Sequence, residues 1–379
     1  MIIFTGGIGL TKLRPAYSND IYTFSTDAGT PLYCDITSQG LSMIRLYPRP
    51  DGSFWLNLKP YISAIINTRK FEDNVVTDFQ SPNPQSFIYD FTTGTYLNLN
   101  LTFTITLDDD STDSISYVLT WYAGCSQIGD LSPLLNTEFH VLTPSLKSTT
   151  NKYYLKYWAG YPFDLSMYYN GDNITLENTT TGYSVDFETF SEVNRIFLSD
   201  GRTSETLEDI MPVADGYNTI RIMADGTPSD NDKYIIINKQ PITCGVYVKW
   251  LNSRGGYSYW LFEDTAKVDR STRSMGEIEN NYSNNESTMA RTLNIGMDAQ
   301  DRIRVTAELL SEDDTAILKD ILSSPKIYMF TGEPASQNDY RNWIEVMLVT
   351  NSTVVKNHKE KLTNFVLDFR APMRDTQTL

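Results

Sequence analysis

Histidine and cysteine are scarce in this chain, and their scarcity limits the chemistry that it can perform. Its 379 residues include two histidines and three cysteines. Neither His140 nor His358 lies in a serine or cysteine nucleophile motif, so the sequence gives no basis for a hydrolytic triad. We interpret His358 as part of a polar loop and His140 as a strand residue whose ring is hydrogen-bonded.

The three cysteines, Cys34, Cys125 and Cys244, lie far apart, without a CxxC pair or a neighbouring histidine to complete a metal site. We therefore expect neither a disulfide framework nor a zinc site. Motifs for phosphate loops, dinucleotide binding, zinc proteolysis and EF-hand calcium binding are also missing from the sequence. These absences predict no cofactor, no metal and no enzymatic activity.

Two chemical alternatives remain open. The acidic turn Asp108–Asp113 offers oxygen ligands for Ca²⁺, but it lacks the glycine and the terminal glutamate of a calcium loop, so we favour an ordinary turn. The paired carboxylates of a glycoside hydrolase would suit an acidic protein rich in tyrosine and tryptophan. No spacing identifies such a pair, because tertiary structure sets the distance between the two groups.

Long hydrophobic runs and positive charge are also lacking. The sequence contains no run of about 18 apolar residues, and Met1–Gly6 does not resemble a secretory signal, so we expect folding in a reducing cytoplasm without membrane insertion. Acidic side chains outnumber basic ones by 47 to 31, which gives a net charge of -16. That charge repels phosphate backbones, so nucleic acid is not an expected direct partner.

Aromatic residues and alternating patterns are abundant, and they predict a mainly β protein. The chain has 24 tyrosines, 17 phenylalanines and 6 tryptophans, enough for packed cores. From Leu97 to Leu107 apolar and polar residues alternate, and after a turn the alternation resumes from Ile115 to Trp121, which predicts a hairpin. Short strands between turn residues recur along the chain and favour sandwiches and barrels.

Composition shifts near 126–139 and after Phe262 divide the chain into three predicted domains. We predict a β-sandwich over residues 1–130, a second over 138–262, both immunoglobulin- or fibronectin-like, and a β-barrel-like domain over 263–379. The last domain should carry one packed helix over 312–323, since Ser311 is a suitable N-cap and Ser-Ser-Pro follows the apolar stripe. A shorter helix is predicted over 203–211.

The segment Gly245–Phe262 reads as two aromatic strands around a Gly-Gly turn. Exposed aromatic residues bind sugars or protein partners, and five candidates stand out for this role: Trp158, Tyr161, Tyr257, Tyr259 and Trp260. The alternative is that they fill the cores. Because side chains alternate along a strand, only one face of the strand belongs to the core. Aromatic side chains on the other face need a cover, and in an assembly a neighbouring subunit supplies it.

Three blocks, 154–169, 245–262 and 307–369, resemble structural proteins of tailed bacteriophages, particularly those of Bacteroidetes hosts. In the last block a helix ending in Ser-Ser-Pro precedes KIYMF, then 343–349 and LTNFVLDF, an order similar to hub and distal-tail proteins. The resemblance implies a virion subunit, made in the host cytoplasm, that forms a ring-like homo-oligomer through its C-terminal barrel and contacts other virion proteins. It carries over no catalytic residue and leaves tail tip, hub, collar and connector open.

Two other functions remain as hypotheses. A carbohydrate-binding adhesin or receptor-binding protein of a phage or bacterium would use the Tyr and Trp side chains to bind host-surface glycan. A glycan-degrading enzyme would place two carboxylates in a cleft lined by aromatic residues. The three functions differ in what they require of the structure: an assembly surface, exposed aromatic rings, or a cleft.

Overall fold

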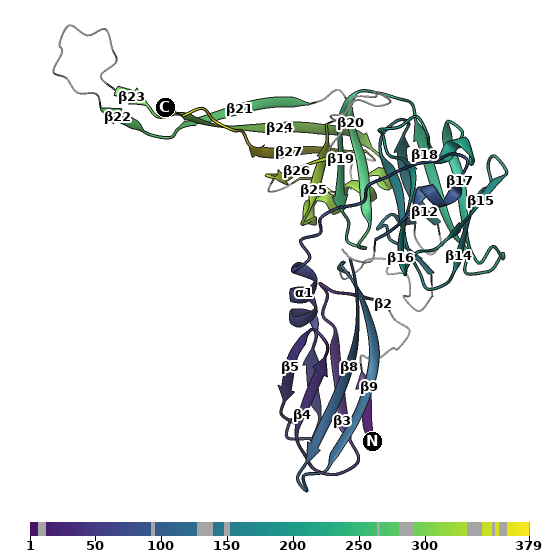
Figure 1. Ribbon diagram of the computed structural model, residues 1–379, viewed down its shortest axis with the longest axis vertical. Helices are drawn as coiled ribbons and strands as arrows, with labels where there is room; N and C mark the ends of the chain where they lie inside the picture. Colours follow the sequence, from purple (N-terminus) through teal and green to yellow (C-terminus); the bar gives the residue numbers. More distant parts are fainter. Residues whose placement is uncertain are drawn as a thin grey trace.

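The computed structural model confirms a mainly β protein (Figure 1). It describes residues 1–6, 13–91, 95–126, 139–147, 152–263, 266–279, 292–331, 343–350, 353–355 and 362–378. One sandwich points downward in Figure 1, a second lies in the body at the right, and a curled sheet extends to the left as a long ribbon of strands. No helix in these described residues is long and apolar enough to cross a membrane.

The first unit is a β-sandwich with strand orders β1-β3-β6 and β2-β9-β8-β4-β5. Its strands are β1 (Ile2–Gly6), β2 (Leu13–Pro15), β3 (Ile21–Thr26), β4 (Pro31–Ser38), β5 (Leu41–Leu46), β6 (Phe54–Asn57), β8 (Tyr96–Leu107) and β9 (Thr112–Tyr122). The rings of Phe24 in one sheet and Phe103 in the other lie 5.4 Å apart between centroids. Aromatic contacts of this kind hold the two sheets together.

The hairpin β8–β9 confirms the clearest pattern in the sequence. In β8 the side chains of Leu101, Phe103 and Ile105 are fully buried, while the threonines between them are partly exposed. Asp110 in the turn has a φ of 62°, the left-handed conformation that aspartate tolerates better than most residues. The period of two therefore sorts one face of the strand into the core and the other toward water.

Residues 71–91 leave the first sandwich and pack on the second. They follow α1 (Lys59–Asn67), contain η1 (Pro84–Phe87), and end in β7 (Ile88–Asp90), which pairs antiparallel with β16 (Val193–Ser199). Phe79 in this segment lies 6.2 Å from Phe197 between ring centroids. The range 1–130, predicted as one domain, thus contributes to two sandwiches. The pairing of β7 with β16 joins residues that are far apart in the sequence, and a shift in composition does not reveal such a pairing.

The second unit consists of a four-stranded sheet, β10-β13-β16-β7, and a six-stranded sheet, β11-β12-β18-β17-β14-β15. Tyr157 of one sheet packs against Phe163 of the other, with centroids 5.2 Å apart. The remaining strands are β10 (Phe139–Val141), β11 (Leu146–Lys147), β12 (Lys152–Trp158), β13 (Phe163–Tyr169), β14 (Asn173–Asn178), β15 (Tyr183–Glu188), β17 (Gly216–Ala224) and β18 (Lys233–Gln240).

The helix predicted over 203–211 is wrong in extent. Only Leu207–Asp209 is helical there, as the 3-10 turn η2, which a capping box between Thr206 and Asp209 begins. Pro212 follows closely. A helix that ends before Pro212 has too few hydrogen bonds to offset the free energy of forming its first turn, so only a 3-10 turn forms.

The third unit is a curled seven-stranded sheet with the order β20-β19-β25-β26-β27-β24-β21. Its strands are β19 (Gly245–Leu251), β20 (Tyr257–Glu263), β21 (Lys267–Ser274), β24 (Met297–Leu310), β25 (Ile327–Phe330), β26 (Trp343–Leu348) and β27 (Thr363–Met373). The aromatic hairpin is β19–β20, with Val246 opposite Phe262. The sheet therefore continues across residue 262, where composition placed a domain boundary.

The helix predicted over 312–323 is confirmed as α3 (Glu312–Leu318) followed by η3 (Lys319–Ser323). The hydroxyl of Ser311 accepts from the backbone N–H of Asp314 at 3.2 Å, and the Asp314 carboxylate accepts from the backbone N–H of Ser311. This reciprocal capping satisfies two N–H groups that the first turn would leave unpaired. Ile317, Leu318 and Ile321 form the buried face.

The strands β21, β24 and β27 project well beyond the body, and the short hairpin of β22 (Glu277–Glu279) and β23 (Thr292–Asn294) lies at their far end (Figure 1). The C-terminus runs along the same ribbon. We call residues 266–279, 292–304 and 366–378 the β-arm. Every residue of its edge strand β21 is exposed.

Candidate functional site

The five aromatic residues proposed as interaction residues are all buried. The exposed fractions are 2% for Trp158 and Tyr161, 5% for Tyr257, and 4% for Tyr259 and Trp260. Trp158 and Trp260 meet edge to face with centroids 5.2 Å apart. These side chains are core residues, as the alternative interpretation held, and they do not form an exposed binding face.

The second sandwich covers the aromatic hairpin, and this explains why the candidate aromatic residues are buried. Tyr161 stacks on Tyr247 of β19 with centroids 4.5 Å apart, and the Tyr247 hydroxyl donates to the carbonyl of Pro162 at 2.7 Å. Every residue of β20 from Tyr257 to Phe262 is buried. The chain itself supplies the cover that the sequence assigned to a neighbouring subunit.

A buried charge network joins the crossing segment 71–91 to the second and third units. Asp73, in the segment that crosses between the units, accepts from Arg195 at 2.7 Å and from Lys249 at 2.5 Å, each through a different carboxylate oxygen. Arg195 also donates to Asp164 at 2.8 Å and to the Tyr259 hydroxyl at 3.3 Å. The exposed fractions of the Arg195 and Lys249 side chains are 1% and 4%. Two cations and two carboxylates are thus shielded from water together.

Burial and mutual attraction compete in setting the pKa of each group. Burial opposes the charge of Asp73, but the positive charges of Arg195 and Lys249 outweigh it and hold the pKa of Asp73 well below its usual range. Burial raises the pKa of Asp164 in spite of its contact with Arg195. Burial also lowers the pKa of Lys249 to about 8, because the attraction of Asp73 compensates only in part.

Aromatic rings surround both cations. The Lys249 ammonium lies 4.3 Å from the ring centroid of Trp343, 5.0 Å from that of Tyr257 and 5.3 Å from that of Tyr328. The Arg195 guanidinium lies 4.7 Å from the ring centroid of Tyr257. Ring faces carry partial negative charge, so they replace part of the lost hydration of a cation.

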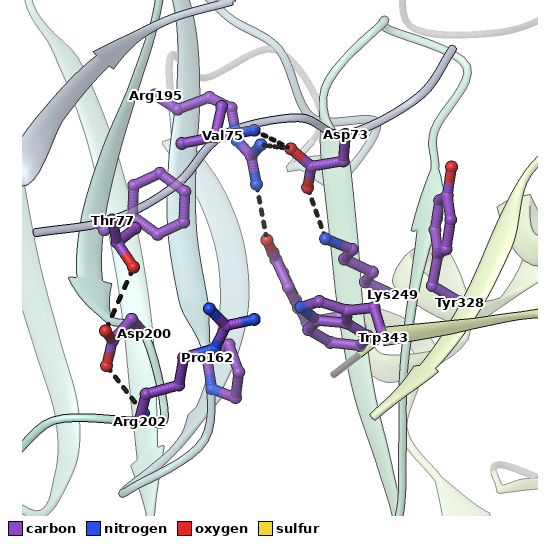
Figure 2. Close-up of a pocket in the computed structure, with 12 residues that line it drawn as sticks. Asp73, Val75, Thr77, Pro162, Arg195, Asp200, Arg202, Lys249, Tyr328 and Trp343 are labelled. Atoms are coloured by element: carbon purple, nitrogen blue, oxygen red, sulfur yellow. Dashed lines mark hydrogen bonds and ion pairs between the residues drawn. The ribbon is translucent and has the colours of Figure 1, made fainter. Parts of the chain in front are cut away.

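A cavity of about 390 Å³ opens beside this network (Figure 2). Arg195, Lys249, Tyr328 and Trp343 contribute to its wall. Asp200 lies across from Lys249, Tyr328 and Trp343 in Figure 2. The cavity is therefore formed by the crossing segment together with the second and third units.

The polar wall of the cavity is built around Asp200. One carboxylate oxygen accepts from the Thr77 hydroxyl at 3.2 Å, and the other accepts from the backbone N–H of Arg202 at 2.7 Å and of Thr203 at 2.9 Å. The side chain is therefore fixed before any ligand arrives. Its oxygens are engaged by donors of the protein itself.

Sequence reasoning missed this site because its residues come from distant segments. Asp73 lies in a stretch without apolar periodicity, and Arg195 is an ordinary strand residue by pattern. One signal was available: Lys249 stands between Val248 and Trp250 in the most aromatic strand of the chain. A charged side chain in such a strand requires a buried partner.

The other residues singled out in the sequence have structural surroundings. Asp109 accepts from the backbone N–H of Ser111 at 3.0 Å, and Asp113 accepts from the Thr26 hydroxyl at 2.8 Å. Among the residues described, no group of three or more His, Cys, Asp or Glu side chains is arranged to hold a metal ion. His140 lies in strand β10, as predicted, and is buried, whereas His358 lies outside the described residues.

The β-arm is the second feature with functional potential. β21 lies at the edge of its sheet and pairs with β24 over eight residue pairs, from Lys267–Arg304 to Ser274–Met297. Its outer edge therefore presents backbone N–H and C=O groups that the sheet leaves unpaired. Val268 and Met297 lie on one face of this pair and are 61% and 44% exposed.

Charge also distinguishes the β-arm from the rest of the chain. Its residues include seven basic and seven acidic side chains, whereas the whole chain has a net charge of -16. Several of these charges pair within the β-arm: Asp301 contacts Arg270 at 2.6 Å and Arg374 at 3.2 Å, and Asp368 contacts Arg304 at 2.8 Å. The negative charge is thus concentrated outside the β-arm.

Comparison with known proteins identifies no family. No family model matches the chain, and no curated protein matches it.

Among solved structures, the tetra-tandem repeat in the extending region of a large adhesion protein is 11% identical over 100% of this chain and 73% of its own, with a TM-score of 0.21. A bacterial ice-binding adhesin is 8% identical over 78% and 95%, with a TM-score of 0.19. An endo-fucoidan hydrolase of glycoside hydrolase family 107 is 14% identical over 77% and 41%, with a TM-score of 0.17. Similarities this low support no argument about function.

Proposed function

We propose that this protein is a non-catalytic structural subunit that assembles with copies of itself through the β-arm. The observation that carries the proposal is the open edge of β21, where eight consecutive residues are exposed. Long exposed strand edges pair readily with other chains, so proteins that keep such edges commonly use them for association. The occupant we assign to this edge is a second copy of the chain.

The side chains of the β-arm support this assignment. Val268 and Met297 place exposed apolar surface on one face of the ribbon. Because the β-arm has no net charge, it can approach another strongly acidic copy without the repulsion that two acidic bodies would experience. Apolar surface that a neighbour covers stabilises association in proportion to the area buried.

The direction of the β-arm favours a ring or a filament over a closed pair. The β-arm extends to one side, away from the body (Figure 1). An arm that contacts the body of the next copy makes a head-to-tail interface, which repeats until it closes into a ring or grows as a filament. Together with the resemblance to hub and distal-tail proteins, this supports a place in a phage tail hub, tail tip or connector ring, located in the virion with other virion proteins as neighbours.

Native mass spectrometry with electron microscopy of the full chain tests the proposal. We expect a closed oligomer at micromolar concentration, and a Val268→Asp variant that dissociates at a protein concentration about tenfold higher or more, because the new charge must be desolvated in the interface. Val118→Asp is the matched control. Val118 is 56% exposed on β9 of the first sandwich, so the same substitution there should leave the oligomer intact.

Two results would contradict assembly through the β-arm. One is a wild-type chain that stays monomeric at tens of micromolar, a protein concentration on the order of the dissociation constants of weak specific complexes. The other is an oligomer that Val268→Asp leaves as stable as Val118→Asp does. Circular dichroism of both variants shows whether each still folds, so that loss of the oligomer is not confused with unfolding.

A further inference from the structure

The cavity between the crossing segment and the second and third units has the size and construction of a small-molecule site. Its volume of about 390 Å³ falls within the roughly 300–1,000 Å³ typical of ligand pockets. Such pockets combine aromatic walls with a few fixed polar groups. Here Trp343 and Tyr328 lie on one side, and Thr77 and Asp200 lie on the other (Figure 2).

The polar groups of the wall show which ligand chemistry fits. Both carboxylate oxygens of Asp73 accept from Arg195 and Lys249, and both of Asp200 accept from donors of the protein. An ammonium carries three N–H bonds, and the described contacts of Lys249 are one carboxylate oxygen and three aromatic rings. Each of these carboxylate oxygens thus already has a donor from the protein, while the buried ammonium keeps N–H bonds for a further acceptor, so a ligand that supplies an acceptor to Lys249 fits this wall.

Lys249 also makes an anionic acceptor favourable. Its ammonium is almost completely shielded from water and shares its nearest carboxylate with Arg195. A second carboxylate at the ammonium would form a charge-assisted hydrogen bond in a setting of low polarity, where such bonds are strong. Arg202 lines the same cavity and adds a second cationic side chain.

The aromatic side of the cavity favours a ring. Trp343 is half-buried and lies beside the Lys249 ammonium, with 4.3 Å between that nitrogen and the ring centroid. The negative face of an aromatic ring attracts the polarised C–H bonds on one face of a sugar. The opposite wall, with Thr77 and Asp200, suits hydroxyl groups along the sugar edge.

We infer that this cavity binds an acidic sugar, with its carboxylate at Lys249 and its ring against Trp343. This gives the glycan-binding hypothesis a site that the sequence did not identify, since none of Lys249, Trp343 and Arg202 was among the candidates. The inference does not depend on assembly through the β-arm. A monomeric variant such as Val268→Asp keeps the cavity and should bind the same sugar.

Isothermal titration calorimetry with the full chain tests the inference, using D-glucuronate, D-galacturonate and N-acetylneuraminate as probes. D-glucose lacks the carboxylate and acetate lacks the ring, so both serve as matched ligand controls. We expect saturable binding of at least one acidic sugar with a Kd of about 1 mM or below, and binding about tenfold or more weaker for both controls.

Two variants locate the site. Trp343→Ala removes the ring, and Arg202→Ala removes an exposed cation without disturbing the core. Each should weaken binding of the acidic sugar about tenfold. Trp55→Ala, at a tryptophan 43% exposed on the first sandwich, should leave it unchanged. Melting temperatures of the three variants show whether lost binding reflects lost folding.

Three results would overturn the inference. The first is no saturable binding of any of the three acidic sugars at about ten times the expected Kd. The second is equal affinity for D-glucuronate and D-glucose, which would remove the role of Lys249. The third is unchanged affinity in both folded cavity variants, which would place the sugar elsewhere.

Discussion

Asp73 and Arg195 are 122 residues apart in the chain, and their side chains meet at 2.7 Å in the interior. Asp73 lies in the segment that leaves the first sandwich, and Arg195 lies on β16 of the second. Because the same carboxylate also contacts Lys249 of the curled sheet, one side chain of the crossing segment contacts both the second and the third unit. The network therefore ties these parts of the chain together beside the cavity.

Replacing Asp73 should test this role. Asp73→Asn keeps the shape of the side chain but leaves two buried cations with one carboxylate, Asp164. We expect the free energy of unfolding to fall by about 3–5 kcal/mol, the usual cost of breaking a buried ion pair by removing one partner. Chemical denaturation followed by circular dichroism measures it.

Asp78→Asn is the matched control for that measurement. Asp78 lies in the same segment and is exposed, so the same change there should alter the free energy of unfolding by no more than about 0.5 kcal/mol. A similar small effect at both positions would mean that the buried network contributes little to stability.

The titration of Lys249 should appear in the pH dependence of stability. Burial lowers its pKa from 10.5 to about 8. Between these values the unfolded chain binds more protons at this lysine than the folded chain does, so its contribution to the free energy of unfolding rises with pH. Well below pH 8 both states hold the proton, and the contribution stays constant.

Comparing wild type with Lys249→Met between pH 8 and 9 isolates this effect. Groups such as Cys34, whose pKa burial raises from 9.0 to about 12, act in the opposite direction, but they are shared by both proteins. We expect the free energy of unfolding to rise more steeply with pH in the wild type. Parallel curves would show that Lys249 does not titrate in this range.

Local patterns were enough to predict the elements of this fold. Alternation over 97–107 gave the strand β8 almost to the residue, and the N-cap Ser311 with an acidic first turn located α3. Both signals depend on neighbours in the sequence: side-chain direction alternates along a strand, and a cap satisfies N–H groups three residues away. The mainly β class followed from the same kind of evidence.

The arrangement of those elements was beyond such patterns. Nothing near Asp73 in the sequence indicates Arg195 or Lys249, because their contact depends on how three sheets pack. Alternation showed that Tyr259 and Trp260 point to opposite faces of β20, but it could not show that the chain itself covers both faces. Burial is a property of the whole fold, so the sequence left open whether the candidate aromatic residues form a surface or a core.

Glycine at the tip of the aromatic hairpin should be required for the units to meet. A Cβ added at Gly256 would lie 2.4 Å from the carbonyl oxygen of Leu142 and 2.9 Å from the Ser166 Cβ. Gly256→Ala should therefore lower the free energy of unfolding by about 1–3 kcal/mol, as overpacking of a close contact does. Gly6→Ala is the control, because nothing lies within 4 Å of its added Cβ. Equal denaturation midpoints for the two variants would contradict the tight junction.

Binding of an acidic sugar should be accompanied by proton uptake at pH 8. Lys249 has a pKa of about 8, so part of the free protein lacks the proton there. A carboxylate at the ammonium favours the charged form and raises this pKa, so binding is accompanied by net proton uptake. Calorimetry in HEPES and in Tris at pH 8 measures the uptake, because the two buffers release protons with different enthalpies.

At pH 6 the binding enthalpy should be the same in two buffers with different ionisation enthalpies. Lys249 is already protonated there before the sugar binds, so no proton is taken up from the buffer. Lys249→Met should abolish the uptake at pH 8, whereas Trp55→Ala, far from the cavity in the first sandwich, should retain it. If the sugar binds at pH 8 without proton uptake, its carboxylate does not lie at Lys249. The ring contact with Trp343 would then have to carry the affinity, and D-glucose should bind as well as D-glucuronate.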